Sequence, residues 1–172
     1  MKTKKLSNFD EVITFIKQEM KYWQFYPSEQ FAREEGDAYI VAKEILKRQP
    51  VVKSSQLRKF YNEAILGFNA IQSTSSSHND VEYARTILAM LLPRIYYARS
   101  RNTINEAFLR FMEAALNLEK FHKDYSNFRQ DYLQFIRFFE AVVGYHNYIE
   151  TISPSSKQGQ RKHKSRNKKT RR

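Results

Sequence analysis

Apolar residues recur at steps of three and four along most of the chain, and the clearest run lies between residues 54 and 71. This spacing places seven apolar side chains on one stripe of a helix: Leu57, Phe60, Tyr61, Ala64, Ile65, Phe68 and Ile71. Basic and polar residues fill the positions off the stripe. Ser54 or Ser55 is expected to cap the first turn by accepting a hydrogen bond from a free backbone N–H. The pattern predicts a core helix with a basic outer edge.

The same periodicity predicts five more helices, over residues 7–22, 28–48, 81–100, 103–121 and 125–149. Gly36 lies inside the second range, so a late start near Asp37 is the alternative for that helix. The expected N-cap of the fourth helix is Asn79 or Asp80, and that of the fifth is Thr103.

The last predicted helix carries a seam of eight positions at heptad-like spacing: Tyr125, Phe128, Tyr132, Phe135, Phe139, Val142, His146 and Ile149. A lone helix of this kind can form a coiled coil. In a chain with five other helices, burial against them is the favoured interpretation, with His146 as a hydrogen-bonded histidine at the edge of the core. Residues 1–152 are therefore predicted to form one all-α domain, a compact bundle of five to six helices.

The composition agrees with a helical core rich in rings, because the chain has 13 Phe, 11 Tyr and one Trp but only four Gly and four Pro. It has no cysteine, which excludes disulfides, thiolate metal sites and a cysteine nucleophile and suits a reducing cytosol. No stretch approaches the roughly 20 apolar residues that a membrane span needs. We expect a cytoplasmic protein without a membrane partner.

Positive charge is concentrated at the C-terminus. The net charge is +12, from 30 basic and 18 acidic residues, and residues 153–172 hold nine of the basic residues and none of the acidic ones. The first 152 residues are thus only mildly basic, with 21 basic against 18 acidic residues. The C-terminal stretch cannot bury a core and is predicted to be a disordered basic tail. It could bind nucleic acid, contact an anionic membrane or confer solubility.

No catalytic pattern is present. The chain has neither a phosphate-binding glycine loop nor a GxSxG elbow. Glu119 and His122 have the spacing of one half of a di-iron site in a helical bundle, but the second Glu-x-x-His is missing. We predict no enzymatic activity, no metal and no cofactor.

Basic residues in the predicted bundle cluster where the third helix begins and where the fourth ends. They are Lys53, Arg58, Lys59, Arg94, Arg99 and Arg101. These residues could form a binding site, or they could have ordinary structural roles. Favourable interaction with a helix C-terminus would explain Arg99 and Arg101, and the lysines could be solvated surface charges. Periodicity alone does not decide between the two interpretations. Tyr96 and Tyr97 could stack on bases, whereas Tyr61 belongs to the apolar stripe and is better explained by core packing.

Three segments carry a family resemblance. SSQLRKFYNEAI, LAMLLPRIYYARSR and FIRFFEAVVGYHNYI, in this order between residues 54 and 149, resemble the small subunit of type III-A CRISPR–Cas effector complexes, the Csm family. LRKFYNE and PRIYYARSR are the most specific parts. The C-terminal tail is not part of the pattern.

The resemblance implies an all-helical, non-catalytic subunit whose copies stack head to tail beside the backbone subunits. Together they form the channel that holds CRISPR RNA paired with target RNA, next to a large polymerase-like subunit. By analogy, the six basic residues above are expected to contact the RNA backbone, with Arg58 and Arg99 ranked first. The alternative is a helical adaptor that binds a protein through its aromatic surface, with the tail on nucleic acid or membrane.

Overall fold

The structure, a computed structural model, describes residues 5–72 and 77–152, and within these ranges the chain is helical and has no strand. The α-helices are α1 Phe9–Thr14, α2 Ser28–Ala32, α3 Asp37–Lys47, α4 Ser54–Ala70, α5 His78–Ser100, α6 Glu106–Ala115 and α7 Tyr125–Ile152. A π-helical turn, η1 Phe15–Glu19, continues α1, and η2 Trp23–Phe25 and η3 Leu118–Lys120 are short 3-10 turns. The all-α prediction is confirmed. The predicted tail lies outside the described residues.

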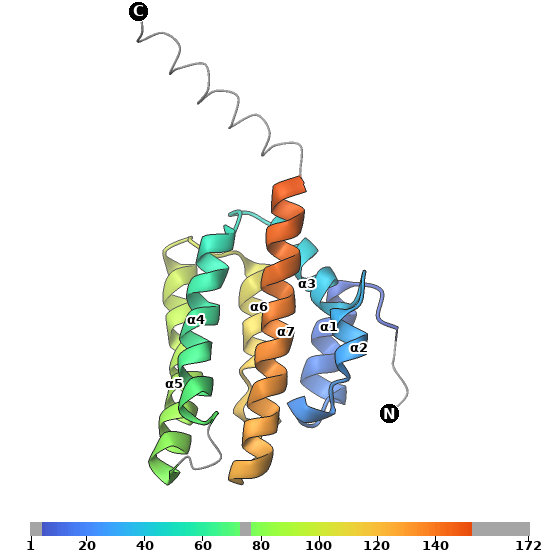
Figure 1. Cartoon of the computed structure of the whole chain (residues 1–172). Coiled ribbons are helices and arrows are strands. Elements are labelled where there is room, and N and C mark those ends of the chain that lie inside the picture. The colour runs from blue at the N-terminus through green and yellow to red at the C-terminus, as the bar shows by residue number, and fades with distance from the viewer. Residues whose placement is uncertain (1–4, 73–76, 153–172) are drawn as a thin grey trace, which may run out of the picture.

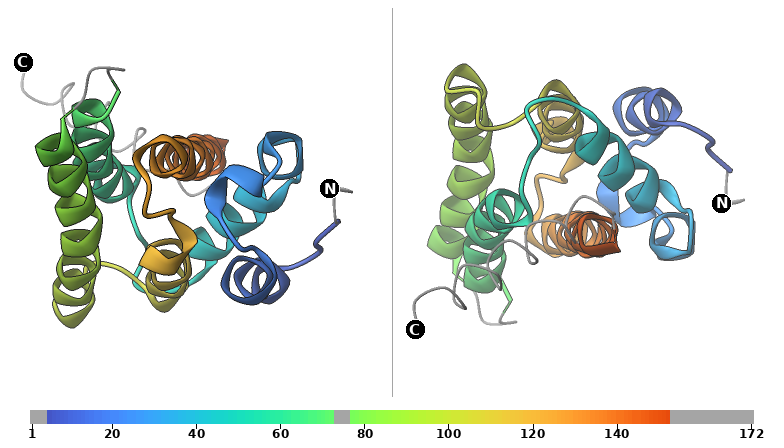
Figure 2. Two further views of the ribbon diagram at one scale, coloured as in Figure 1. Left: turned by 90° about the horizontal axis from the view of Figure 1, so that it is seen from below. Right: turned by 90° about the horizontal axis from the view of Figure 1, so that it is seen from above.

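Helix α7 is the centre of the bundle (Figure 1). It packs against α4 on one side and against α2, α3 and η2 on the other. Helix α4 also pairs with α5, which runs antiparallel to it and forms the outer wall (Figures 1 and 2). The seam predicted for the last helix is buried as expected. Six of its eight positions are buried, and the two end positions, Tyr125 and Ile149, are half-buried.

Aromatic rings fill the space around α7. The largest fully buried ones are Trp23, Tyr26, Phe31, Phe108, Phe111, Phe128, Tyr132, Phe135, Phe138 and Phe139. The Trp23 ring lies 5.5 Å from Phe135 and 5.6 Å from Phe138, and its indole N–H donates to the Ala115 carbonyl over 3.0 Å. These contacts tie η2 to both α6 and α7, so the high aromatic content is used mainly for packing.

The expected helix over 28–48 is divided into α2 and α3, and the late start at Asp37 is correct. Asp37 is fully buried and accepts hydrogen bonds from the Tyr26 hydroxyl, at 2.6 Å, and from the Gln30 amide, at 2.8 Å. Burial raises the pKa of Asp37 despite these two donors. A Cβ at Gly36 would lie 2.7 Å from the Gln30 carbonyl oxygen, so the turn between α2 and α3 needs glycine.

The expected serine cap of α4 is wrong. Lys53 precedes the helix, and its backbone N–H donates to the Gln56 side chain over 3.0 Å. The Ser54 side chain instead points into the bundle, where its oxygen lies 3.1 Å from His146 Nδ1. Ser55 is exposed. The Ser54 hydroxyl, which local spacing assigned to the helix cap, therefore contacts a buried residue of α7 instead.

The expected caps of the next two helices are also displaced. Ser77 caps α5 by accepting from the Asp80 N–H, at 3.3 Å, while Asp80 accepts from the Ser77 N–H, at 2.6 Å. Asn105 caps α6 by accepting from the Phe108 N–H over 3.1 Å. The Thr103 hydroxyl donates to the Ala98 carbonyl at the end of α5, so α6 begins later than predicted.

Candidate nucleic-acid interface

The antiparallel pairing of α4 and α5 brings the two predicted basic clusters to one end of the bundle. Helix α4 begins at Ser54 and α5 ends at Ser100, and these two ends lie together at the top of Figure 1. Helix α7 ends at Ile152 at the same end. Basic residues that are 35 or more positions apart in sequence thus share one region of the surface.

Three of the six predicted residues line one groove between α4 and α5. Lys59 comes from α4, Arg94 from α5, and Arg101 follows α5 directly; the groove has a volume of about 450 Å³. Its other lining residues are Phe60, Glu63, Tyr97, Ala98 and Thr103. We call this set of eight residues the α4–α5 groove.

The cations of the α4–α5 groove differ in how far they are neutralised. Arg94 donates to Glu63 over 2.9 Å, so an acid on α4 offsets its charge. Arg101 lies over the Tyr97 ring at 5.8 Å and donates to the Tyr97 hydroxyl at 3.3 Å, which orients it without neutralising it. Lys59 is exposed and has no ion-pair partner in the part of the chain that the structure describes. Lys59 and Arg101 supply the groove's uncompensated charge.

The other three predicted residues do not line the groove. Lys53 is exposed at the start of α4. Arg58 is exposed one turn from both Ser54 and Tyr61, which contact α7, so it lies on the α7 side of α4. Arg99 pairs with Glu106, on α6, at 3.5 Å. The structure therefore separates Arg58 and Arg99, the two residues that the sequence ranked first.

The exposed tyrosines near the end of α5 have different surroundings. Tyr97 is 64% exposed, next to Arg101, and presents the most open large ring of this region. Tyr96 is 48% exposed, and its hydroxyl donates to Glu113 over 2.7 Å. Tyr61 is half-buried and lies edge-on to Phe139 at 5.7 Å, as core packing requires.

The sequence analysis did not identify Glu63 as an acid within the basic cluster. Glu63 lies four residues after Lys59 on the same helix, a spacing at which side chains meet, so its proximity to Lys59 could have been predicted. Its contact with Arg94 was not available, because it depends on the pairing of α4 with α5.

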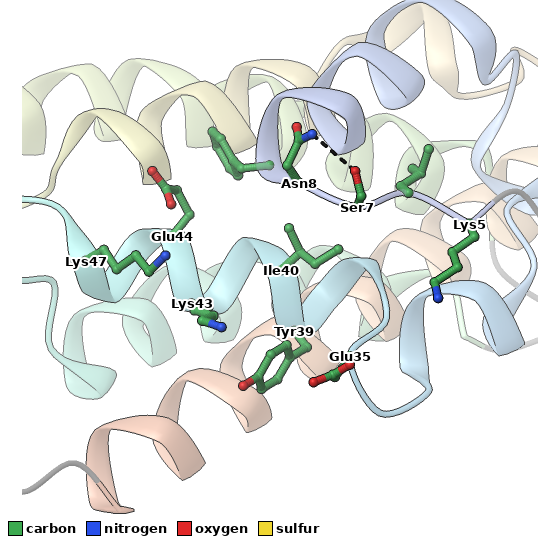
Figure 3. Close-up of a pocket in the computed structure, with 11 residues that line it drawn as sticks. Lys5, Ser7, Asn8, Glu35, Tyr39, Ile40, Lys43, Glu44 and Lys47 are labelled. Atoms are coloured by element: carbon green, nitrogen blue, oxygen red, sulfur yellow. Dashed lines mark hydrogen bonds between the residues drawn. The ribbon is translucent and has the colours of Figure 1, made fainter.

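A second cavity, of about 390 Å³, lies between the start of α1 and helix α3 (Figure 3). Its charged lining residues are Lys5, Lys43 and Lys47 together with Glu35 and Glu44. The lysines project from different sides in Figure 3, and two glutamates line the cavity with them, of which Glu44 pairs with Arg48 at 2.6 Å. This cavity is a weaker candidate for a polyanion than the α4–α5 groove.

His122 has a structural role in this fold. Its Nδ1 lies 2.7 Å from Asp131 Oδ2, which also accepts from the His122 N–H at 2.7 Å. The other oxygen of Asp131 accepts from the Gln24 N–H at 2.9 Å, and the His122 ring stacks on Tyr22 at 3.5 Å. Across residues 5–72 and 77–152, no group of three or more His, Cys, Asp or Glu side chains is arranged to hold a metal ion.

None of the described helices is both long enough and apolar enough to cross a membrane. Comparison with curated proteins finds no match, and comparison with solved structures finds none. A family model, Csm2 Type III-A, matches residues 28–151, from α2 almost to the end of α7. The match covers well over half of the chain and includes the three segments noted in the sequence, and the chain therefore belongs to the Csm2 Type III-A family, the small subunit of the type III-A CRISPR Csm complex.

Proposed function

We propose that this chain is a non-catalytic, RNA-binding small subunit of the Csm complex, and that the basic end of α4 and α5 contacts the RNA backbone. The observation that carries the proposal is the α4–α5 groove, in which Lys59 and Arg101 lie together on the surface with uncompensated charge. The groove lies within the residues that the family model matches.

The chemistry of this end suits phosphate oxygens better than base edges. Its donors are exposed cations that lie along two helices, and they are not set in a closed pocket of polar groups. Contacts with phosphates fix position without reading sequence, and in a guide–target duplex base pairing already reads the sequence. Tyr97 adds an exposed ring on which an unpaired base could stack.

Head-to-tail stacking of copies into a filament is the second part of the proposal. It requires two different patches on each molecule. The bundle has exposed apolar side chains at both ends, such as Phe25 and Leu118 near the start of α7 and Tyr96 and Tyr97 near the end of α5. Guide RNA, target RNA, the backbone subunits and the large polymerase-like subunit are the proposed partners.

The test measures RNA affinity against salt for the full chain and for two double variants. The groove pair is Lys59→Ala with Arg101→Ala, and the flanking pair is Arg58→Ala with Arg99→Ala. On single-stranded RNA each lost phosphate contact removes about 0.7 from the slope of log K against log salt, so loss of two contacts flattens it by roughly 1 to 2. We expect the groove pair to have the larger effect, because Glu106 already offsets the charge of Arg99, whereas Lys59 and Arg101 are uncompensated.

The matched control is Lys123→Ala with Arg137→Ala, which removes the same charge from exposed positions just before α7 and on α7. The control should leave the slope unchanged. If both test pairs bind RNA with the wild-type slope, the assignment of the interface to this end is wrong. A chain that enters the Csm complex but binds RNA in none of these forms would favour a protein-binding adaptor.

A further inference from the structure

Tyr97 has the most exposed large apolar side chain in the part of the chain that the structure describes, at 64%. It lines the α4–α5 groove on the α5 side, and Lys59 lines it on the α4 side. Arg101 lies over the Tyr97 ring at 5.8 Å. Contacts with phosphates alone would accept paired and unpaired RNA equally and would need no ring. An exposed ring between two uncompensated cations therefore points to a more specific ligand.

The end of α5 presents Tyr97 and Arg101 on a fixed backbone. The Arg101 N–H donates to the Tyr97 carbonyl over 3.2 Å, so the two residues lie one turn apart. Asn102 then adopts a left-handed φ of 55°, and the Thr103 N–H donates to the Ala98 carbonyl over 3.0 Å. This is the Schellman closure of a helix, in which a left-handed residue ends the last turn. The ring and the guanidinium group are thus held in place before any ligand binds.

The neighbouring ring, Tyr96, has surroundings that suit RNA less well. Its hydroxyl donates to Glu113 over 2.7 Å, and this carboxylate would repel a phosphate. Glu63 is the acid that lines the α4–α5 groove, and it pairs with Arg94 at 2.9 Å. Tyr97 is therefore the exposed ring at this end of α5 whose polar contact is a cation.

A base can stack on a protein ring only where one of its faces is open. Inside a duplex the neighbouring pairs cover both faces of each base, whereas the bases of a single strand can turn outward onto aromatic side chains. A basic groove that carries an aromatic ring is the usual means by which proteins hold a single strand without reading its sequence. The groove volume of about 450 Å³ is also typical of a site for one small ligand.

We propose that the α4–α5 groove binds one unpaired RNA nucleotide, whose base stacks on Tyr97 while Lys59 and Arg101 contact the phosphates beside it. This inference rests on the proposed function and specifies its ligand as single-stranded RNA. Because base stacking is tolerant of sequence, the groove selects unpaired RNA without selecting a particular base.

The first experiment measures the Kd of the full chain for a single-stranded RNA of about ten nucleotides. Tyr97→Ala should raise Kd about 5- to 150-fold, the usual range for the loss of one stack between a base and a ring. The slope of log K against log salt should not change, because no charge is removed. Tyr97→Phe keeps the ring and should bind within about twofold of the wild type.

The matched control for the first experiment is Tyr83→Ala, which removes a ring that is 50% exposed near the start of the same helix. This control should leave Kd unchanged. A wild-type Kd for Tyr97→Ala overturns the inference, and so does an equal loss in the two alanine variants.

The second experiment tests whether the ring meets a base. The measurements are repeated with a strand of abasic ribose spacers, which keeps the phosphates, and with the same RNA annealed to its complement. On both ligands Tyr97→Ala should change Kd by less than about twofold, because neither offers an unpaired base. An equal loss on the abasic strand would show that the ring acts only by orienting Arg101, and this result would overturn the inference.

These readouts separate this inference from the proposed function. If Lys59→Ala with Arg101→Ala flattens the salt slope while Tyr97→Ala changes nothing, only this inference fails. If that pair leaves the slope unchanged, the bundle interface fails, and a nucleotide held in the groove fails with it. Sedimentation of the wild type and of Tyr97→Ala without RNA tests whether the ring instead joins copies of the chain. Weaker self-association of Tyr97→Ala, with RNA binding unaffected, would assign the ring to a protein interface and would overturn the inference.

Discussion

Ser54, the first residue of α4, lies with its hydroxyl oxygen 3.1 Å from Nδ1 of His146 on α7, and both side chains are buried. The same hydroxyl donates to Glu150. One small side chain therefore connects the start of one helix to the last turns of another, 92 and 96 residues away. This connection sets where the basic end of α4 lies relative to the end of α7.

Ser54→Ala is expected to destabilise the bundle by about 1 to 3 kcal/mol, because it removes the partner of two polar groups in or near the core. Urea unfolding followed by circular dichroism measures the loss. The control is Ser55→Ala, at the adjacent exposed position, which should change the free energy of unfolding by less than about 0.5 kcal/mol. Equal effects of the two substitutions would mean that the Ser54 hydroxyl contributes nothing beyond local helix formation.

Protonation of His146 is expected to weaken the fold. Burial lowers the pKa of His146, although the nearby Glu150 carboxylate opposes the shift, and Nε2 is buried without a hydrogen-bond partner in the described part of the chain. The folded state therefore binds this proton less well than the unfolded chain, whose histidine has a pKa of about 6.5. Between these two pKa values the unfolded state holds more protons, so stability falls as pH falls below about 6.5.

The measurement is the free energy of unfolding from pH 7.5 down to pH 5 for the wild type and for His146→Asn, which cannot titrate. The difference between the two should be constant above about pH 7 and should shrink below about pH 6.5, by at most about 1.4 kcal/mol per pH unit. The comparison is needed because the raised pKa of Asp37 acts in the opposite direction at acidic pH. A difference that is independent of pH would contradict the prediction.

The long helices were predictable because their information is local. The stripe on α4 and the seam on α7 repeat at helical spacing, and Gly36 marked the start of α3. The cap of α5 is local, because Ser77 and Asp80 bond to each other, but the caps of α4 and α6 were not predictable, since the residues concerned have distant partners. Ser54 turns to α7, and the Asn105 amide donates to the carbonyls of Ile45, Arg48 and Pro50.

The candidate site was also predictable only in part. Sequence spacing identified cations at two helix ends, and the resemblance suggested what they contact. Only the antiparallel packing of α4 on α5 places Lys59 and Arg101 in one groove and moves Arg99 toward Glu106. This pairing could not be predicted from the sequence, because Lys59 and Arg101 are brought together only by the way the helices pack in the bundle.

Two glycines in long helices should respond oppositely to alanine. At Gly67, on α4, a Cβ would lie 2.4 Å from the Tyr132 hydroxyl and 3.1 Å from Ile87. That hydroxyl donates to the Ala64 carbonyl over 2.8 Å and is fully buried with its ring, so it has little room to move. Gly67→Ala should cost about 1 to 3 kcal/mol of unfolding free energy, in spite of the better helix propensity of alanine.

Gly144→Ala is the matched control on α7, because nothing lies within 4 Å of the added Cβ. It should stabilise the bundle by about 0.5 to 1 kcal/mol. Removal of the hydroxyl in the double variant Gly67→Ala, Tyr132→Phe should recover part of the loss at Gly67. Thermal unfolding of the four proteins is the measurement, and a stabilising Gly67→Ala would show that α4 and α7 are less closely packed than described.

Glu63→Gln should strengthen RNA binding, because it releases Arg94 from the ion pair at 2.9 Å and removes a negative charge from the α4–α5 groove. One added phosphate contact steepens the salt slope on single-stranded RNA by about 0.7. Stability should change by less than about 1 kcal/mol, as the pair is partly exposed to solvent.

The control is Glu82→Gln, an exposed acid near the other end of α5, which changes net charge equally and should leave the slope unaltered. The same gain in both variants would point to a general charge effect. A gain in Glu63→Gln alone, lost again when Arg94→Ala is added, would identify Arg94 as the group that binds the extra phosphate.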